Sequence, residues 1–203
     1  MIKNIVFDFG DIFINLDKEA TFKKLAKLGV DKITDAMVVI AHQYEKGEIS
    51  TDDFIDFFHE KYKISRLDLV DAWNAILLDF PEHRFQFLKE LVSSKKHRLF
   101  LLSNTNDLHI KWIQNDWGAE LYQDFKNCFE RFYLSHEIHF RKPNTDIYDF
   151  VLRENRLKAE ETFFIDDTVE NTLAAEELGI KTWNLMPGKE DVVNLLKRKE
   201  FSS

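Results

Sequence analysis

Short apolar runs and amphipathic stretches alternate along the second half of the chain. Runs rich in β-branched and aromatic residues predict buried strands, whereas apolar residues that recur every three or four positions predict helices. The predicted strands are 2–7, 99–102, 131–134, 162–165 and 181–185, and the predicted helices are 82–93, 108–117, 146–154, one that ends at Leu178 and one near the C-terminus. This alternation predicts an α/β fold in which a mostly parallel sheet carries helices on both faces.

The segment between the first two predicted strands is far longer than the ~10–12 residues that a crossover between parallel strands needs. One helix, 82–93, is enough for the crossover, and the rest of the segment reads as further amphipathic helices. We therefore predict two domains: an α/β core formed by 1–15 and 80–203, and a helical cap formed by 16–79. A helical module inserted directly after the first strand is expected to lie over the carboxyl ends of the strands, as a lid.

Composition and charge exclude several functional classes of protein. The 203 residues include 19 Phe and 4 Trp, which is ample for a core. A formal net charge of −8 argues against a nucleic-acid partner, because phosphate backbones bind to basic surfaces. The single cysteine, Cys128, indicates a reducing compartment, and no apolar run approaches the ~20 residues of a membrane span. These features predict a cytoplasmic protein without membrane or nucleic-acid partners, and no pattern indicates an oligomeric state.

Polar side chains follow three of the predicted strands. They are Asp8, then Ser103 and Asn104, then Asp166 and Asp167. Each alone is also typical of a turn or of a helix cap. Together they predict a crevice at the carboxyl ends of the strands, where open α/β sheets bind ligands. Carboxylates gathered there repel one another unless a cation or a proton intervenes, and hard oxygen ligands of this kind suit Mg²⁺.

A basic pair, Arg141-Lys142, precedes Pro143 in a loop before the helix 146–154. Alone, it is typical of a solvated charge pair. In the company of the three strand ends, it adds a cationic group that an anionic substrate would need in an acidic protein.

These residues carry a resemblance to phosphatase-type members of the haloacid dehalogenase superfamily. The four motifs, in order, are Asp8 at the end of the first strand, Ser103-Asn104 after an apolar strand, Lys142 in Arg-Lys-Pro, and Asp166-Asp167 with Asn171, Ala175 and Gly179. Each motif alone is unspecific, but all four occur in order over 8–179. The resemblance implies a Rossmann-like core with a five-stranded parallel sheet and a small helical cap inserted after the first strand.

Other stretches sharpen the resemblance. Phe7–Gly10, Tyr44–Ser50, Leu102–Asn106 and Tyr133–Ser135 resemble the subgroup that contains bacterial α-D-glucose-1-phosphate phosphatases. The position of the helical insertion agrees with the small cap of that subgroup.

The resemblance implies a mechanism. Asp8 would attack phosphorus and form an aspartyl-phosphate, which divides hydrolysis into two steps. Lys142 would stabilise the phosphoryl oxygens, with Ser103 and the backbone of Asn104 orienting them.

The resemblance also implies a metal site. Mg²⁺ would be held by Asp8, the carbonyl of Gly10 and Asp166, while Asp167 would hold the outer shell of the metal or a water. The implied activity is that of a Mg²⁺-dependent phosphomonoester hydrolase acting on a small phosphorylated metabolite, with a sugar phosphate as the favoured class.

One position departs from the wider superfamily. Most of its phosphatases carry a second Asp two residues after the nucleophile, as general acid and base, and here that residue is Gly10. General acid–base catalysis contributes ~10²–10⁴ in rate. Asp11 is the nearest substitute, although one position further on its side chain is expected to point elsewhere. The cap residues His42, Tyr44 and Glu45 are weaker candidates.

Two alternatives stay open. A 2-haloacid dehalogenase needs no metal and would leave the Asp166-Asp167 pair without a role. A phosphate-binding or scaffold protein of low or no catalytic activity would account for the loss of the acid–base residue at position 10.

Overall fold

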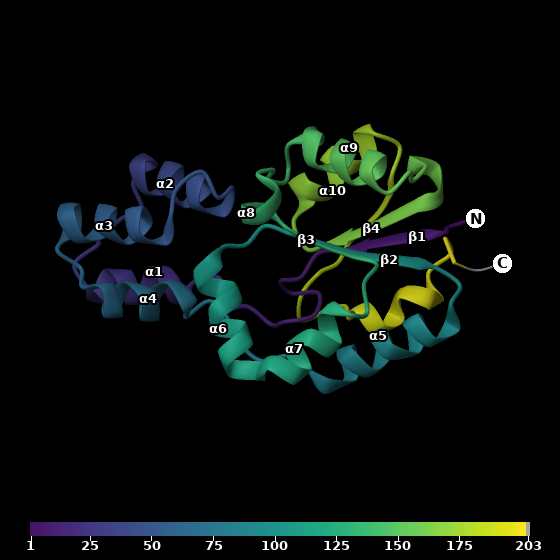
Figure 1. The fold of residues 1–203 in the computed structure, drawn as a ribbon, viewed down its shortest axis with the longest axis horizontal. Coiled ribbons are helices and arrows are strands. Elements are labelled where there is room, and N and C mark those ends of the chain that lie inside the picture. The colour runs from purple at the N-terminus through teal and green to yellow at the C-terminus, as the bar shows by residue number, and fades with distance from the viewer. Residues whose placement is uncertain (202–203) are drawn as a thin grey trace.

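The computed structural model describes residues 1–201 and contains one five-stranded sheet in the order β3-β2-β1-β4-β5 (Figure 1). All four strand pairs are parallel. The strands are β1 (Asn4–Phe7), β2 (Arg98–Ser103), β3 (Arg131–Leu134), β4 (Thr162–Asp166) and β5 (Lys181–Asn184). The predicted α/β fold with a five-stranded parallel sheet is confirmed.

Helices cover both faces of this sheet, α9 and α10 on one and α5 to α7 on the other (Figure 1). The α-helices are α1 (Ala20–Lys27), α2 (Asp35–Glu45), α3 (Thr51–Tyr62), α4 (Arg66–Asn74), α5 (Glu82–Ser94), α6 (Asp107–Trp117), α7 (Ala119–Lys126), α8 (Ser135–Ile138), α9 (Thr145–Glu154) and α10 (Val169–Glu177). The 3₁₀ helices are η1 (Ala159–Glu161) and η2 (Val192–Lys197). The predicted C-terminal helix is present as the 3₁₀ helix η2, whereas α7 and α8 were not predicted.

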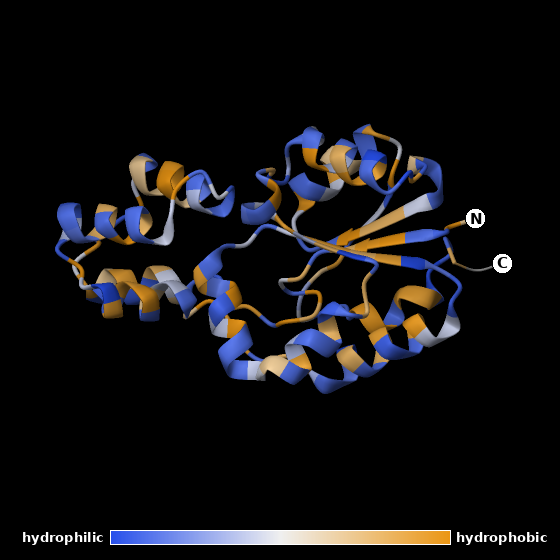
Figure 2. Cartoon of the chain, viewed as in Figure 1, coloured by the Kyte–Doolittle hydropathy of each residue, from blue (hydrophilic) through white to orange (hydrophobic). Residues whose placement is uncertain are grey.

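Alternate residues of each strand enter different apolar clusters. Ile5 and Phe7 of β1 pack with the helices on the α5 face, whereas Val6 packs with Phe100 and Leu102 against α9 and α10. Figure 2 shows the strands as largely apolar between helices whose outer faces are polar. Burial on both faces explains why the strands read as continuous apolar runs rather than as an alternating pattern.

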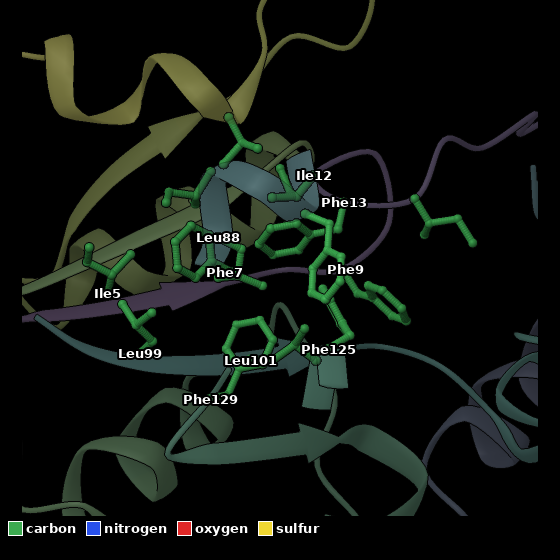
Figure 3. Packing of buried hydrophobic residues seen from close by; sticks show 14 of the residues in the cluster. Ile5, Phe7, Phe9, Ile12, Phe13, Leu88, Leu99, Leu101, Phe125 and Phe129 are labelled. Atoms are coloured by element: carbon green, nitrogen blue, oxygen red, sulfur yellow. The ribbon is translucent and has the colours of Figure 1, made fainter. Parts of the chain in front are cut away.

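The α5-side cluster is rich in aromatic rings, and Phe125 lies at its centre. The Phe125 ring is fully buried and stacks on Phe9 with ring centroids 5.2 Å apart. It also meets Phe13 and Phe129 edge to face, each at 5.2 Å (Figure 3). Phe9 comes directly after Asp8, so this packing holds the end of β1 in place.

Phe125→Ala is expected to lower the free energy of unfolding by about 3–5 kcal/mol, because it removes transfer free energy and leaves a cavity among rigid rings. Urea denaturation measures the loss. The control is Leu67→Ala on α4, where the side chain is 81% exposed and a change within about 0.5 kcal/mol is expected. Equal effects of the two substitutions would contradict this assignment of the core.

Helices α1 to α4 form a separate group beyond the carboxyl ends of the strands (Figure 1). They share an apolar cluster of their own, to which α6 contributes Leu108. The two segments that connect this group to the rest of the chain run antiparallel. The Asn15 N–H donates to the backbone carbonyl of Asp79 at 2.9 Å, and Leu16 forms a β-bridge with Leu77. The predicted boundaries, 15/16 and 79/80, fall at these paired connections, and we propose that 16–79 forms the cap.

Candidate active site

The carboxyl ends of β1, β2 and β4 lie side by side because β1 is the middle strand of the three. Phe7 is in register with Leu101 on one side and with Ile165 on the other. The next residue, Asp8, donates its backbone N–H to the Ile165 carbonyl at 2.8 Å. Asp8 and Asp166 are therefore neighbours, although the chain separates them widely.

Lys142, in the loop between α8 and α9, joins these strand ends. Its ammonium donates to Asp8 Oδ1 at 2.7 Å, to Asp166 Oδ2 at 2.6 Å and to the Leu102 carbonyl at 2.8 Å. The side chain is 1% exposed. Burial opposes its charge, but the carboxylates of Asp166 and Asp8 outweigh burial and raise the pKa of Lys142. Lys142 is thus held as a buried cation between two carboxylates.

The two carboxylates differ in their surroundings. Burial raises the pKa of Asp8 to about 7, although the ammonium of Lys142 opposes the shift. Asp166 is fully buried and accepts the Asn171 amide on both oxygens at 3.0 Å, and the Thr168 N–H at 2.8 Å. Asp166 is therefore fixed by many donors, whereas Lys142 is the one side-chain donor to Asp8 among residues 1–201.

Asn104 holds the backbone of Lys142 in a way that sequence reasoning missed. Its Oδ1 accepts the Lys142 N–H at 3.0 Å, and its Nδ2 donates to the Lys142 carbonyl at 2.9 Å. The Asn104 amide thus bonds both the N–H and the carbonyl of Lys142, as the backbone of a neighbouring β-strand would. Ser103 is buried at the end of β2, where its hydroxyl lies 3.5 Å from the Asn104 carbonyl.

The turn after β1 contains a residue in the left-handed conformation. This residue is Asp11, with φ of 55°, and not Gly10. A Cβ at position 10 would lie 2.7 Å from Cδ1 of Leu16, the end of a flexible side chain that can shift, so packing alone does not require glycine here. Asp11 accepts the Leu16 N–H at 3.0 Å and lies 3.2 Å from Lys18 Nζ. These contacts engage both carboxylate oxygens of Asp11, and its acid–base role remains a prediction.

Lys18 is a further residue that sequence reasoning missed. Its ammonium bonds Asp167 as well as Asp11. Burial raises the pKa of Asp167 against the opposing effect of Lys18. No local pattern indicates this contact, because Lys18 belongs to the segment that leads into α1.

The carboxylates fit a divalent cation. Asp8, Asp166 and Asp167 each offer an oxygen atom, and these atoms lie within 4.8 Å of one another. Oxygen donors are the ligands that Mg²⁺ prefers. Three carboxylates beside the ammonium groups of Lys142 and Lys18 leave a net negative charge, which a divalent cation would offset.

Helix α2 meets the loop that carries Lys142. Arg141 Nε donates to Glu45 at 2.6 Å, and Arg141 Nη1 donates to the Lys142 carbonyl at 3.0 Å. A second contact joins the same regions, since His139 Nδ1 lies 2.9 Å from the Lys46 carbonyl. Helix α2 also contacts α6, where the Leu108 N–H donates to the Tyr44 hydroxyl at 3.1 Å. The proposed cap thus bonds the residue next to Lys142.

The arrangement agrees with comparisons against known proteins. The model of one protein family, haloacid dehalogenase-like hydrolase, matches residues 2–179. The chain belongs to this family. The predicted superfamily is therefore confirmed, whereas membership of the glucose-1-phosphate phosphatase subgroup remains a prediction.

Three known proteins are similar to this chain over most of its length. The chain is 26% identical to the D-ribitol-5-phosphate phosphatase of Bacteroides thetaiotaomicron, over 90% of this chain and 91% of the relative. It is 27% identical to the glyceraldehyde 3-phosphate phosphatase of Methanocaldococcus jannaschii, over 93% and 87% respectively. The magnesium complex of a haloacid dehalogenase family enzyme from B. thetaiotaomicron matches with a TM-score of 0.85 and 35% identity, over 97% of this chain and 99% of that one.

None of the helices within residues 1–201 has the length and apolar character needed to cross a bilayer.

Proposed function

We propose that the protein is a Mg²⁺-dependent phosphomonoesterase that acts through an aspartyl-phosphate on Asp8. The observation that carries the proposal is the buried contact of Lys142 with both Asp8 and Asp166 at the carboxyl ends of parallel strands. A nucleophile, a cation and a further metal ligand are thereby within reach of one phosphate group.

We further propose that the substrate is a small sugar or polyol phosphate. Two relatives are named as phosphatases of D-ribitol-5-phosphate and of glyceraldehyde 3-phosphate, which are both phosphate esters of short polyhydroxylated chains. The contact of Glu45 with Arg141 gives the cap a polar group beside the Lys142 loop, which suits recognition of hydroxyl groups.

In the first step, an Asp8 oxygen attacks phosphorus and the ester oxygen leaves. Lys142 holds Asp8 in position and balances the negative charge on the phosphoryl oxygens. Asn104 keeps the Lys142 backbone in place, and Ser103 and the Asn104 backbone orient the phosphoryl group. Mg²⁺ bound by Asp8, Asp166 and the Gly10 carbonyl would supply further positive charge between nucleophile and phosphate. Asp167 would hold the outer shell of the metal.

In the second step, water hydrolyses the aspartyl-phosphate and regenerates the Asp8 carboxylate. Both steps move a proton, to the leaving oxygen and then from water. Gly10 has no side chain to carry it, which predicts slow turnover or proton transfer through solvent.

The test of this function is phosphate release from a panel of C3–C6 sugar and polyol monophosphates, with Mg²⁺ and with EDTA. Turnover is expected with Mg²⁺, and removal of the metal is expected to reduce it by at least about 10²-fold, since metal charge stabilisation is worth several kcal/mol. Release of phosphate from no ester would refute the proposal.

The same samples separate the two alternatives. Binding of orthovanadate without turnover of any ester would favour a phosphate-binding protein. Chloride release from a 2-haloacid in EDTA would favour the dehalogenase.

Gly10→Asp, combined with Leu16→Ala to remove the 2.7 Å contact, is expected to raise kcat by on the order of 10²-fold relative to Gly10→Ala with Leu16→Ala. The two double variants share the Cβ at position 10 and the shortened side chain at position 16, and they differ in the carboxyl group at position 10. A pH profile of kcat that gains an acidic limb only in the Asp variant would identify the restored proton carrier. Equal rates in the two double variants would show that proton transfer does not limit turnover.

A further inference from the structure

Basic side chains gather at the amino ends of the strands, at the opposite end of the sheet from Asp8. They line a cavity of about 360 Å³. The six cationic residues around it are Lys3, Lys95, Lys96, Arg98, Arg156 and Lys158. Glu161 is the one acidic residue that lines the cavity. This concentration of positive charge is unexpected in a chain of net charge −8.

Two of the six cations already have partners. Arg98 holds the Glu130 carboxylate through two hydrogen bonds, at 2.8 and 2.6 Å, and Lys3 pairs with Glu161 at 2.7 Å. The other four make no side-chain hydrogen bond and no ion pair within residues 1–201: Lys95, Lys96, Arg156 and Lys158. Lys158 also interacts electrostatically with Glu161. Three positive charges, those of Lys95, Lys96 and Arg156, therefore face the cavity region without an acidic partner in the described part of the chain.

Helix ends explain only part of this cluster. Lys95 follows the last turn of α5 and Arg156 follows that of α9, where the helix dipole favours cations. Lys3 instead directly precedes β1, Arg98 begins β2, and Lys158 precedes η1. Three separate parts of the chain thus bring cations to one cavity, at a cost in mutual repulsion that a bound anion would relieve.

We propose that this cavity binds a compact anion with two linked phosphate groups. A single phosphate dianion would balance only two of the three unpaired charges, whereas a diphosphate carries enough negative charge to balance all three. Glu130 and Glu161, which are paired with Arg98 and Lys3, lie at the same end of the sheet. Their negative charges would repel a polyanion that extends beyond the cavity. The site lies at the start of β1 and the active site at its end, so this proposal does not rest on the proposed phosphatase activity.

The probe is inorganic pyrophosphate, titrated into the full chain without Mg²⁺. The readout is the ring Cε1 proton of His97 in NMR spectra, since His97 also lines the cavity and its resonance is identified with His97→Gln. A saturable shift of this resonance is expected, and it reports on this cavity rather than on Asp8. ADP as a second probe distinguishes a nucleotide from inorganic diphosphate as the source of the same group.

Lys96→Ala with Lys158→Ala is expected to weaken pyrophosphate binding at least about tenfold, because two charge-assisted contacts are lost. Neither residue has a positive φ, so alanine fits both backbones. The matched control is Lys32→Ala with Lys189→Ala, two exposed lysines away from the cavity, which should leave the affinity unchanged.

Three results would overturn the proposal. One is a His97 resonance that does not saturate or does not move. Another is the same loss of affinity in both double variants, which would indicate a response to net charge alone. Equal affinity for inorganic phosphate and pyrophosphate would refute the requirement for two linked phosphates.

Discussion

Asp8→Asn removes turnover while the protein still folds. The amide keeps the shape and an acceptor oxygen for Lys142 but is no nucleophile, so kcat is expected to fall by on the order of 10⁴–10⁶-fold. Folding is expected to survive, because Lys142 retains Asp166 at 2.6 Å and the Leu102 carbonyl at 2.8 Å. Phosphate release measures the first effect, and thermal denaturation measures the second.

Mass spectrometry of acid-quenched samples adds a direct test of the covalent step. The wild-type protein mixed with a turned-over ester is expected to carry a phosphate adduct on the peptide that contains Asp8, and the Asp8→Asn variant to carry none. Asp56→Asn is the matched control, since this carboxylate is exposed on α3 and should affect neither readout. Turnover retained by Asp8→Asn would refute the aspartyl-phosphate mechanism.

The parts of the site that lie at strand ends could be predicted from sequence. Apolar runs locate buried strands, and parallel strands in one sheet bring their carboxyl ends to one edge. These two rules alone are enough to predict that Asp8 and Asp166 lie close together. Lys142 lies in a loop, where periodicity says nothing. Its function was indicated by the polar strand ends elsewhere in the chain and by its place in the ordered set of motifs.

The contacts that sequence reasoning missed are made by side chains that reach between distant segments. Lys18 bonds Asp167 across 149 positions, and the Asn104 amide pairs with the Lys142 backbone across 38. Neither contact leaves a periodic pattern. The turn after β1 depends on a contact of the same kind: Asp11 has a positive φ, and its carboxylate accepts the N–H of Leu16, five positions further on.

Lys142→Met tests whether the buried cation does more than bind substrate. The variant keeps most of the apolar stem and removes the ammonium, so Asp8 and Asp166 lose a shared partner inside the protein. Leaving buried carboxylates unpaired costs about 3–5 kcal/mol. The loss of charge stabilisation of the phosphoryl oxygens is expected to lower kcat by at least about 10²–10³-fold. Urea denaturation and phosphate release measure the two effects, with the exposed Lys189→Met as the control.

The effect of Mg²⁺ separates the structural role of Lys142 from the catalytic one. Mg²⁺ held by the carboxylates would offset part of the repulsion that the substitution leaves, so it is expected to raise the Tm of Lys142→Met more than that of the wild-type protein. It is not expected to restore kcat, because the ammonium is also needed on the phosphoryl oxygens. Recovery of both stability and turnover at high Mg²⁺ would contradict a catalytic role, and it would assign Lys142 solely to charge balance between Asp8 and Asp166.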